Sequence, residues 1–305
     1  MLENDMKYRL YHDESKQSGY WHGMLLVPED SSNRLVQLLQ HVRDNTGHDA
    51  PLGIKNVAIP RGKLFRCAQA WVLLGVGLMR TKAGRKPYQI HLGETKLGRT
   101  VFCKLDETLG LKFILFHEKD NHQKMKFLNR YANKVETTFR MGLKGGLNFM
   151  SSDEHPIHIT KIHFDGNEHH GQGIDNARII GRLTGLRSSC SVINGDDVID
   201  DRSSNHNRDD SQNYDDCQIL QLTDLLVGSF RTFLGECTRD VHKHLCHATR
   251  LPIEAFSRGF AGFRNSRWYG SFCMSQCELL NGEWSFSTLE LIKDIKGEQL
   301  GLPVD

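Results

Sequence analysis

The amino-acid sequence predicts a mixed α/β fold, in which one sheet opens on an antiparallel hairpin and carries helices on both faces. Two runs of strand propensity, 7–13 and 20–27, are separated by a turn and form the expected hairpin. Two more apolar runs of strand length, 112–117 and 157–164, alternate with segments of helical periodicity. Such alternation is typical of a sheet covered by helices, and 305 residues are enough to bury its core.

The remaining elements follow from apolar spacing and from residues that start or stop helices. Polar residues at 30–32 offer N-caps for a first helix, in which apolar residues recur at helical spacing from 35 to 42. The other predicted helices are 63–79, 121–143, 176–183 and 218–234, and the additional strand candidates are 53–59 and 189–194.

The chain divides into two expected parts. Residues 1–234 would form a sheet domain, and residues 235–305 a helical or irregular extension packed on it, with a final amphipathic helix around Ile292. The segment 200–216 is acidic, rich in Ser and Asn and free of aliphatic residues, so it is predicted to be a mobile loop.

Composition limits the location of the protein more than it limits its partners. A net charge of +2, from 39 basic and 37 acidic residues, neither favours nor excludes nucleic acid. The most apolar stretch, 67–79, is too short to cross a bilayer, and the first residues lack the apolar core of a signal peptide. Eight cysteines without a repeating frame suit reduced thiols, so a cytoplasmic protein is expected.

Asp224 is the most informative residue, because it interrupts a run that is otherwise apolar enough for a core helix. An ionised carboxylate removed from water costs several kcal/mol or more unless a donor or cation compensates it. On a helix, Gln221, Asp224 and Gly228 fall along one stripe, and Gly228 would let another chain segment approach closely. The alternatives are a structural acid that caps a neighbouring element or one that pairs with Arg231.

Other acids end predicted strands. Asp13 and Glu14 close the first strand, and because successive strand residues face opposite sides, only one of them can point into a given site. Asp165 ends the strand at 157–164, the position where open α/β sheets place ligands. Glu118 and Asp120 follow the strand at 112–117 in the same way. Each of these acids also reads as an ordinary turn residue.

A set of carboxylates from distant segments suits Mg²⁺ or Mn²⁺, which bind carboxylate oxygen together with water and substrate phosphate. Two such ions, roughly 3.5–4 Å apart, would clamp the attacking and leaving oxygens of a phosphoryl displacement. The sequence therefore predicts a divalent-metal site, with Mg²⁺ or Mn²⁺ as cofactor.

Three sequence motifs occur in an order that resembles a known bacterial family. Asp13-Glu14-Ser15 follows the first strand, Gly53-Ile54-Lys55 lies on the expected third strand, and Gln221-Leu222-Thr223-Asp224-Leu225-Leu226-Val227-Gly228 lies on the last helix. This pattern resembles the family called domain of unknown function 3800, which is similar to the ribonuclease H-like superfamily. The resemblance covers roughly residues 7–234 and is most specific in the last helix.

The resemblance implies a fold and a set of site residues. It implies a ribonuclease H-like sheet and a catalytic, metal-binding role for Asp13, Asp165 and Asp224. Lys55 would meet a phosphate or a neighbouring acid, and the remaining supporting residues would be Glu14, Gln221, Glu118 and Asp216. Lys16 and Gly53 depart from the family pattern, which usually has glycine after the serine and often an acid before Ile-Lys.

The C-terminal part contains a competing site. A structural zinc ion would select four of its cysteines and histidines, for example Cys237, Cys246, Cys273 and Cys277, or a set that includes histidine. Their spacing is not that of a familiar finger or ribbon, and buried thiols are the favoured interpretation.

The favoured function is a metal-dependent nuclease or related phosphoryl-transfer enzyme acting on DNA or RNA. Exposed basic residues would contact phosphate, namely Arg61, Lys63, Arg66, Arg258, Arg264 and Arg267. One alternative is a non-catalytic module on the same fold that binds nucleic acid or a protein partner. Another is a zinc-stabilised interaction protein in which the acids are structural. The family also suggests a role in phage defence or in a mobile element.

Overall fold

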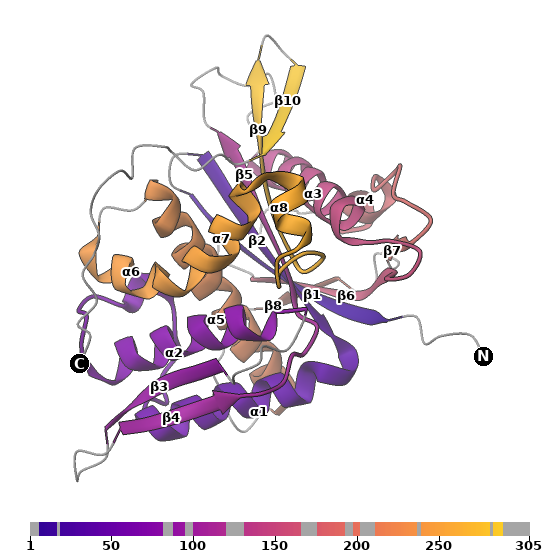
Figure 1. The fold of residues 1–305 in the computed structure, drawn as a ribbon. Helices are drawn as coiled ribbons and strands as arrows, with labels where there is room; N and C mark the ends of the chain where they lie inside the picture. The colour runs from indigo at the N-terminus through magenta and orange to yellow at the C-terminus, as the bar shows by residue number, and fades with distance from the viewer. Residues whose placement is uncertain are drawn as a thin grey trace.

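The computed structural model describes residues 6–16, 19–81, 88–94, 100–119, 131–165, 176–192, 198–201, 211–236, 239–280 and 283–288. These residues form a mixed α/β fold whose main sheet has the strand order β10-β9-β5-β2-β1-β6-β7, with β8 pairing to β6 as well (Figure 1). The predicted mixed α/β class is therefore confirmed. The final amphipathic helix and Asp120 lie outside the described residues.

The sheet opens on the predicted hairpin. Strands β1 (Lys7–Ser15) and β2 (Gly19–Pro28) pair antiparallel, with Asp13 opposite Gly23. On either side of this hairpin the pairing is to β6 (Ile157–Asp165), parallel to β1, and to β5 (Lys112–Lys119), antiparallel to β2. Strands β1, β5 and β6 therefore run in one direction, and their last residues reach the same edge of the sheet.

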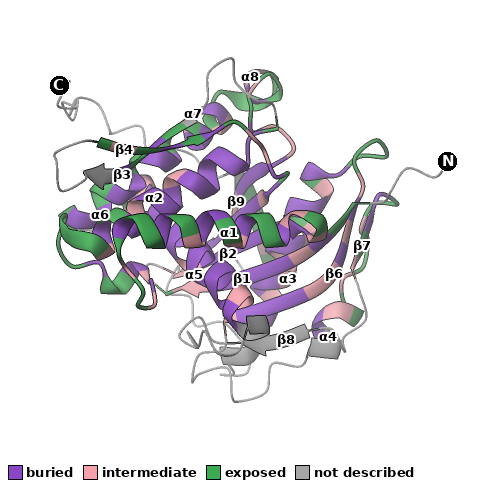
Figure 2. Cartoon of the chain, turned by 90° about the horizontal axis from the view of Figure 1, so that it is seen from below, coloured by how far each residue is buried: buried purple, intermediate pink, exposed green. Residues whose placement is uncertain are grey.

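Helices cover both faces of the sheet. One face packs against α1 (Glu29–Thr46), α2 (Gly62–Leu78) and α5 (Ser211–Arg231), and the other packs against α3 (Tyr131–Met150) and α4 (Asn176–Gly181). Each face has its own buried apolar cluster, as the alternation of side chains along a strand requires. Figure 2 shows α1 with a buried side toward the sheet and an exposed side toward solvent.

Several predicted boundaries are wrong, and each error has a local cause. Helix α1 begins at Glu29, directly after Pro28, so the residues at 30–32 belong to its first turn and supply no side-chain cap. The segment 53–59 contains the 3₁₀ turn η1 (Ile54–Asn56) where a strand was predicted, because its backbone bonds locally and, at Ile54, to the side chain of Asp224 on α5.

The acidic segment 200–216 is ordered at both ends. Strand β8 (Val198–Asp201) pairs with β6, and α5 begins at Ser211, which contradicts a loop throughout 200–216. This polar segment still forms the first turns of α5, because Tyr214 and Cys217 are buried in the folded protein. Helix α3 extends to Met150, seven residues beyond the predicted end at 143, and α5 gives way at Thr232 to the π-helical turn η4 (Thr232–Glu236).

Residues after 235 contribute to the main sheet. Strand β9 (Phe272–Leu280) lies parallel to β5, and β10 (Glu283–Thr288) extends the sheet as its edge strand. The short helices α6 (Asp240–Leu245), α7 (Arg250–Ser257) and α8 (Gly259–Arg264), with the turn η5 (Cys246–Thr249), precede β9. The sequence did not predict β9 or β10. Short strand β7 (Cys190–Val192) and the separate ribbon β3 (Tyr88–Glu94) with β4 (Thr100–Leu105) complete the structure.

Within the described part of the chain, no helix is long and apolar enough to cross a membrane.

Gly228 allows the predicted close approach at α5. A Cβ built on Gly228 would lie 2.6 Å from Cγ1 of Ile54, well inside van der Waals contact. Ile54 is itself almost fully buried. Only a residue without a side chain therefore lets the η1 turn pack against α5 at this point.

The Gly228→Ala variant should destabilise the protein by about 1–3 kcal/mol, because the added methyl group overpacks against Ile54. Urea unfolding followed by circular dichroism would measure the change. Gly145→Ala is the matched control, since Gly145 is an exposed residue inside α3 with nothing within 4 Å of its Cβ position. Alanine there should stabilise by about 0.5–1 kcal/mol. Equal stability of the Gly228 variant and the wild type would contradict the packing described.

Candidate functional site

Parallel strands bring two of the predicted acids to one edge of the sheet. The pairing of β1 with β6 places His12 opposite Phe164, and the next residues along the two strands are Asp13 and Asp165. The carboxylate of Asp165 is close enough to Asp13 for its negative charge to raise the pKa of Asp13. The two strand ends therefore form one acidic corner.

Helix α5 adds the third acid. Tyr11 and Asp13 project from β1 to the same face, and Tyr11 is buried in the apolar cluster that includes α5. The side chain of Asp224 is half-buried on this helix and hydrogen-bonds with the carboxyl group of Asp13. The structure thus brings together Asp13, Asp165 and Asp224, which are widely separated in sequence.

The surroundings of Asp13 and Asp224 disfavour ionisation of both carboxyl groups at once. Burial raises the pKa of Asp13 well above its usual range, and the charges of Asp224 and Asp165 raise it further. Burial also raises the pKa of Asp224, while hydrogen bonds from the Ile54 N–H and from Asp13 act in the opposite direction. Two interacting carboxyls of this kind titrate as a unit, and they share a proton before both become ionised.

The backbone of residues 52–60, called the strap below, lies against the carboxylate of Asp224. The Ile54 N–H donates to Oδ2 of Asp224 at 2.7 Å. A Cβ on Gly53 would lie 3.2 Å from the same oxygen, so glycine lets the strap lie directly against the carboxylate. The glycine that departs from the family pattern therefore has a physical reason in this chain.

Gln221 has a structural role. Its Oε1 accepts hydrogen bonds from the Leu52 N–H at 2.8 Å and from Nη2 of Arg43 at 2.7 Å. Arg43 is fully buried, also donates to Gln218 at 2.8 Å, and lies over the ring of Trp71. Gln218 and Gln221 therefore fasten α5 to α1 and to the strap, one turn before Asp224.

The lysines near the site are exposed. Lys55 follows Ile54 in η1, and its positive charge lowers the pKa of Asp224, so the predicted neighbouring acid is present. Lys16 lies beyond the end of β1, where Nζ is 3.3 Å from Oε1 of Glu14. Lys55 is thus an exposed cation beside Asp224, where its ammonium group would suit a phosphate, whereas Lys16 pairs with Glu14.

Glu14 and Glu118 lie on the other face of the sheet. Glu14 neighbours Asp13 on β1 and so points away from α5, as the sequence predicted for one residue of this pair. On β5, Glu118 points to the same side as Ile114 and Phe116, which belong to the apolar cluster under α3. Both acids are buried or nearly buried there, and neither completes the acidic corner.

Asp216 belongs to a separate polar group. It accepts a hydrogen bond from the Tyr11 hydroxyl at 2.7 Å and lies 3.9 Å from Arg9 and 3.8 Å from His163. Burial lowers the pKa of His163 to about 4, so this imidazole is neutral at pH 7. Eight residues of helix separate Asp216 from Asp224, about 12 Å along the axis, which removes Asp216 from the carboxylate pair.

The donor set suits a hard cation, but it is only partly assembled. Among the described residues, no group of three or more His, Cys, Asp or Glu side chains is placed to hold a metal ion. Mg²⁺ is usually held by one or two carboxylates, with water and substrate phosphate as the other ligands. Asp13 and Asp224 match that limited requirement, and a cation between them would offset the burial and the neighbouring negative charge that raise their pKa values.

The cysteines do not gather into a described site. Cys273 and Cys277 are buried on β9 in the cluster under α3, whereas Cys246 lies in η5 beside the backbone of Lys243. Burial raises the pKa of Cys273 to about 12, which disfavours the thiolate that zinc would bind. Cys237 lies outside the described residues.

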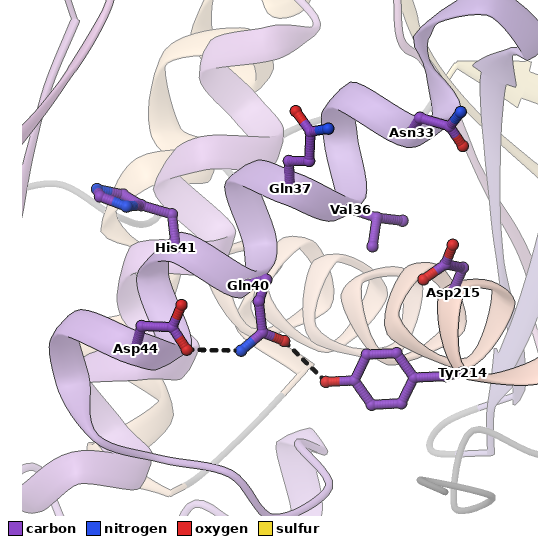
Figure 3. A pocket seen from close by; sticks show the side chains of 8 residues that line it. All are labelled: Asn33, Val36, Gln37, Gln40, His41, Asp44, Tyr214 and Asp215. Atoms are coloured by element: carbon purple, nitrogen blue, oxygen red, sulfur yellow. Dashed lines mark hydrogen bonds between the residues drawn. The ribbon is translucent and has the colours of Figure 1, made fainter. Parts of the chain in front are cut away.

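A surface hollow lies away from the acids, between α1 and the start of α5. Figure 3 shows Gln40 between Asp44 and Tyr214, with hydrogen bonds of 2.7 Å and 2.8 Å to them. Asp215 also lines this hollow, and its position on α5 is more than two turns before Asp224. The hollow therefore belongs to another surface of the protein.

Sequence reasoning missed Arg43 and Gln218. The available signal was a charged residue, Arg43, directly after Val42 in the apolar stripe of the first helix, together with two glutamines on the apolar side of the last helix. Such polar groups in a core need each other as partners.

No protein-family model, no curated protein and no solved structure matches this chain. The likeness to the domain of unknown function 3800 therefore stays a prediction from motifs.

The Asp13→Asn variant should be more stable than the wild type at pH 7 in the absence of divalent metal, by about 0.5–2 kcal/mol, a common gain when strain at a site is removed. A raised folded-state pKa means that ionisation of Asp13 costs stability above its unfolded pKa. As the pH falls toward 4, the wild-type carboxyl becomes protonated and the advantage of the variant should shrink. Thermal unfolding at both pH values would measure it, with exposed Asp153→Asn as the control. If Asp13→Asn were less stable than the wild type at pH 7, the raised pKa of Asp13 would be refuted.

Proposed function

We propose that this protein is a divalent-metal-dependent nuclease or related phosphoryl-transfer enzyme with a ribonuclease H-like fold, akin to the domain of unknown function 3800. The observation that supports the proposal is the contact between Asp13, at a strand end, and Asp224, on α5, with Asp165 near enough at the neighbouring strand end to act on Asp13 through its charge. Strand ends at one edge of an α/β sheet are the usual place for a ligand.

The chemistry of the pair supports a cation in preference to general acid catalysis alone. Like charges in a buried place are tolerated when a cation or proton compensates them. Both carboxyls present hard oxygen donors, which suit Mg²⁺ or Mn²⁺ better than softer ions. When bound there, such an ion would neutralise charge that develops on a phosphoryl group during displacement.

The residues of the chain would divide the work around a bound phosphodiester. The Ile54 N–H fixes one oxygen of Asp224 and so orients the carboxylate that hydrogen-bonds with Asp13. Asp165 adds negative charge at the same corner. Lys55 is exposed beside Asp224, where its ammonium group would contact a phosphate oxygen of the substrate.

The Asp224→Asn variant should lose metal-dependent cleavage of DNA or RNA by about 100-fold or more, because a site ligand worth several kcal/mol is removed. A labelled oligonucleotide incubated with Mg²⁺ or Mn²⁺ and resolved by gel would measure the rate. Asp215→Asn is the matched control, an acid on the same helix that lines a different surface. Cleavage that is retained by Asp224→Asn or that persists in EDTA would refute the proposed mechanism.

A second candidate function is a non-catalytic module that binds nucleic acid or a protein partner. The observation that favours it is the absence, among described side chains, of a ready group of three metal ligands, together with the use of Oδ2 of Asp224 by the strap. This module would bind its partner equally well with or without EDTA, and it would release no product after long incubation with Mg²⁺.

A further inference from the structure

The exposed cations divide between opposite edges of the sheet. Strand β5 starts beside the turn at 267–271, where the Phe113 N–H donates to Ser271 and the Thr81 N–H donates to Arg267. The strands β1, β5 and β6 all begin at this edge. Asp13 and Asp165 lie at the opposite edge, where β1 and β6 end. Arg267, and Arg264 just before it, therefore lie far from the carboxylates and do not border them.

A second group of cations lies at the carboxylate edge. Helix α2 starts immediately after the strap and runs toward Thr81, so its first turns belong to the same end of the molecule as Asp224. Arg61, Lys63 and Arg66 occupy this start, and all of them are exposed. Together with Lys55 they give the strap and the first turns of α2 a positively charged outer surface.

Helix α6 extends this surface on the far side of the strap. Gln69 of α2 contacts the backbone of His244, so the two helices lie against each other (Figure 1). His242 of the same helix hydrogen-bonds to backbone groups of the strap at Val57 and Ile54. The strap is thus held between Asp224 on one side and α6 on the other.

A hollow of about 510 Å³ lies where the strap meets α6. Arg239 and His244 stand at its lining, and both are exposed. Asp240 is the acid in this lining, and its carboxylate is 2.9 Å from Nζ of Lys243, which offsets its charge. The full lining is Ala58, Pro60, Arg239, Asp240, Val241 and His244.

The spacing suits a polymer that passes over the carboxylates. Ala58, at the rim of the hollow, is four residues from Ile54, so at most about 14 Å of chain separates it from the contact with Asp224. At a rise of about 3.4 Å per nucleotide, that upper limit corresponds to at most about four nucleotides. A phosphate in the hollow and a phosphate at Asp224 would belong to the same strand.

We propose that the strap, the start of α2 and the hollow beside α6 form a subsite for the sugar–phosphate backbone of a nucleic acid whose reacting phosphate lies at Asp13 and Asp224. The assignment of the reacting end rests on the proposed nuclease function. The basic surface itself would bind phosphate without reading base sequence, because exposed Arg and Lys side chains contact backbone oxygens. Ile59, 62% exposed at the strap, adds an apolar contact for a sugar or base.

Binding of a fluorescein-labelled oligonucleotide, measured by anisotropy in EDTA over a range of salt, tests the subsite without catalysis. The double variant Arg61→Glu with Arg239→Glu should weaken binding about 10-fold or more and reduce the slope of log Kd against log salt by about 2. The charge-matched control, Arg264→Glu with Arg267→Glu, should bind like the wild type. Single-stranded DNA, its RNA counterpart and a duplex serve as separate probes to identify the source of the backbone.

The subsite would be overturned if the Arg61/Arg239 variant kept the affinity and salt slope of the wild type. It would also be overturned if the Arg264/Arg267 control lost affinity equally, or if the wild type bound none of the probes. Should the reversed charges prevent folding, Arg61→Gln with Arg239→Gln must show the same direction of change. Cleavage lost in Asp224→Asn with unaltered binding in the Arg variants would reject the subsite alone. Weaker binding in those variants without any cleavage by the wild type would reject the nuclease alone.

Discussion

The polar stripe of α5 is the interaction on which the arrangement of the site depends. Gln218, Gln221 and Asp224 follow one another at intervals of three residues, and each binds a group from the first quarter of the chain. Removing one partner of a buried hydrogen bond costs about 1–3 kcal/mol, more when the group left behind is charged. Because buried Arg43 joins two of these residues, the stripe fixes both α1 and the strap relative to the sheet.

The same carboxylate serves the fold and the proposed chemistry, and this creates a conflict between them. Asp224 positions the strap through Ile54 but also stands against Asp13, where burial and repulsion raise the pKa of both acids. A fold selected for stability alone would place an amide at one of the two positions. Retaining two acids here is the kind of local cost that proteins accept at functional sites.

Local patterns predicted the elements that carry the acids, because alternation and apolar runs identify β1, β2, β5 and β6 without tertiary information. Two features were beyond such reasoning. Strand β9 pairs with β5 across more than 150 positions of the sequence, and its alternation is weak at Gln276. The strap has the composition of a strand, but its N–H groups bond to Gln221 and Asp224, a competition that only the folded chain reveals.

Strand direction determines which charges can act together. Because β1, β5 and β6 are parallel to one another, Asp13 and Asp165 share one edge, and the turn carrying Arg267 occupies the other. Composition alone gives a nearly neutral chain, yet the fold separates an acidic corner and its neighbouring cations from a distant basic turn. A phosphate polymer would therefore meet Lys55, Arg61 and Arg239 at the carboxylate edge, where local positive charge, and not net charge, determines attraction.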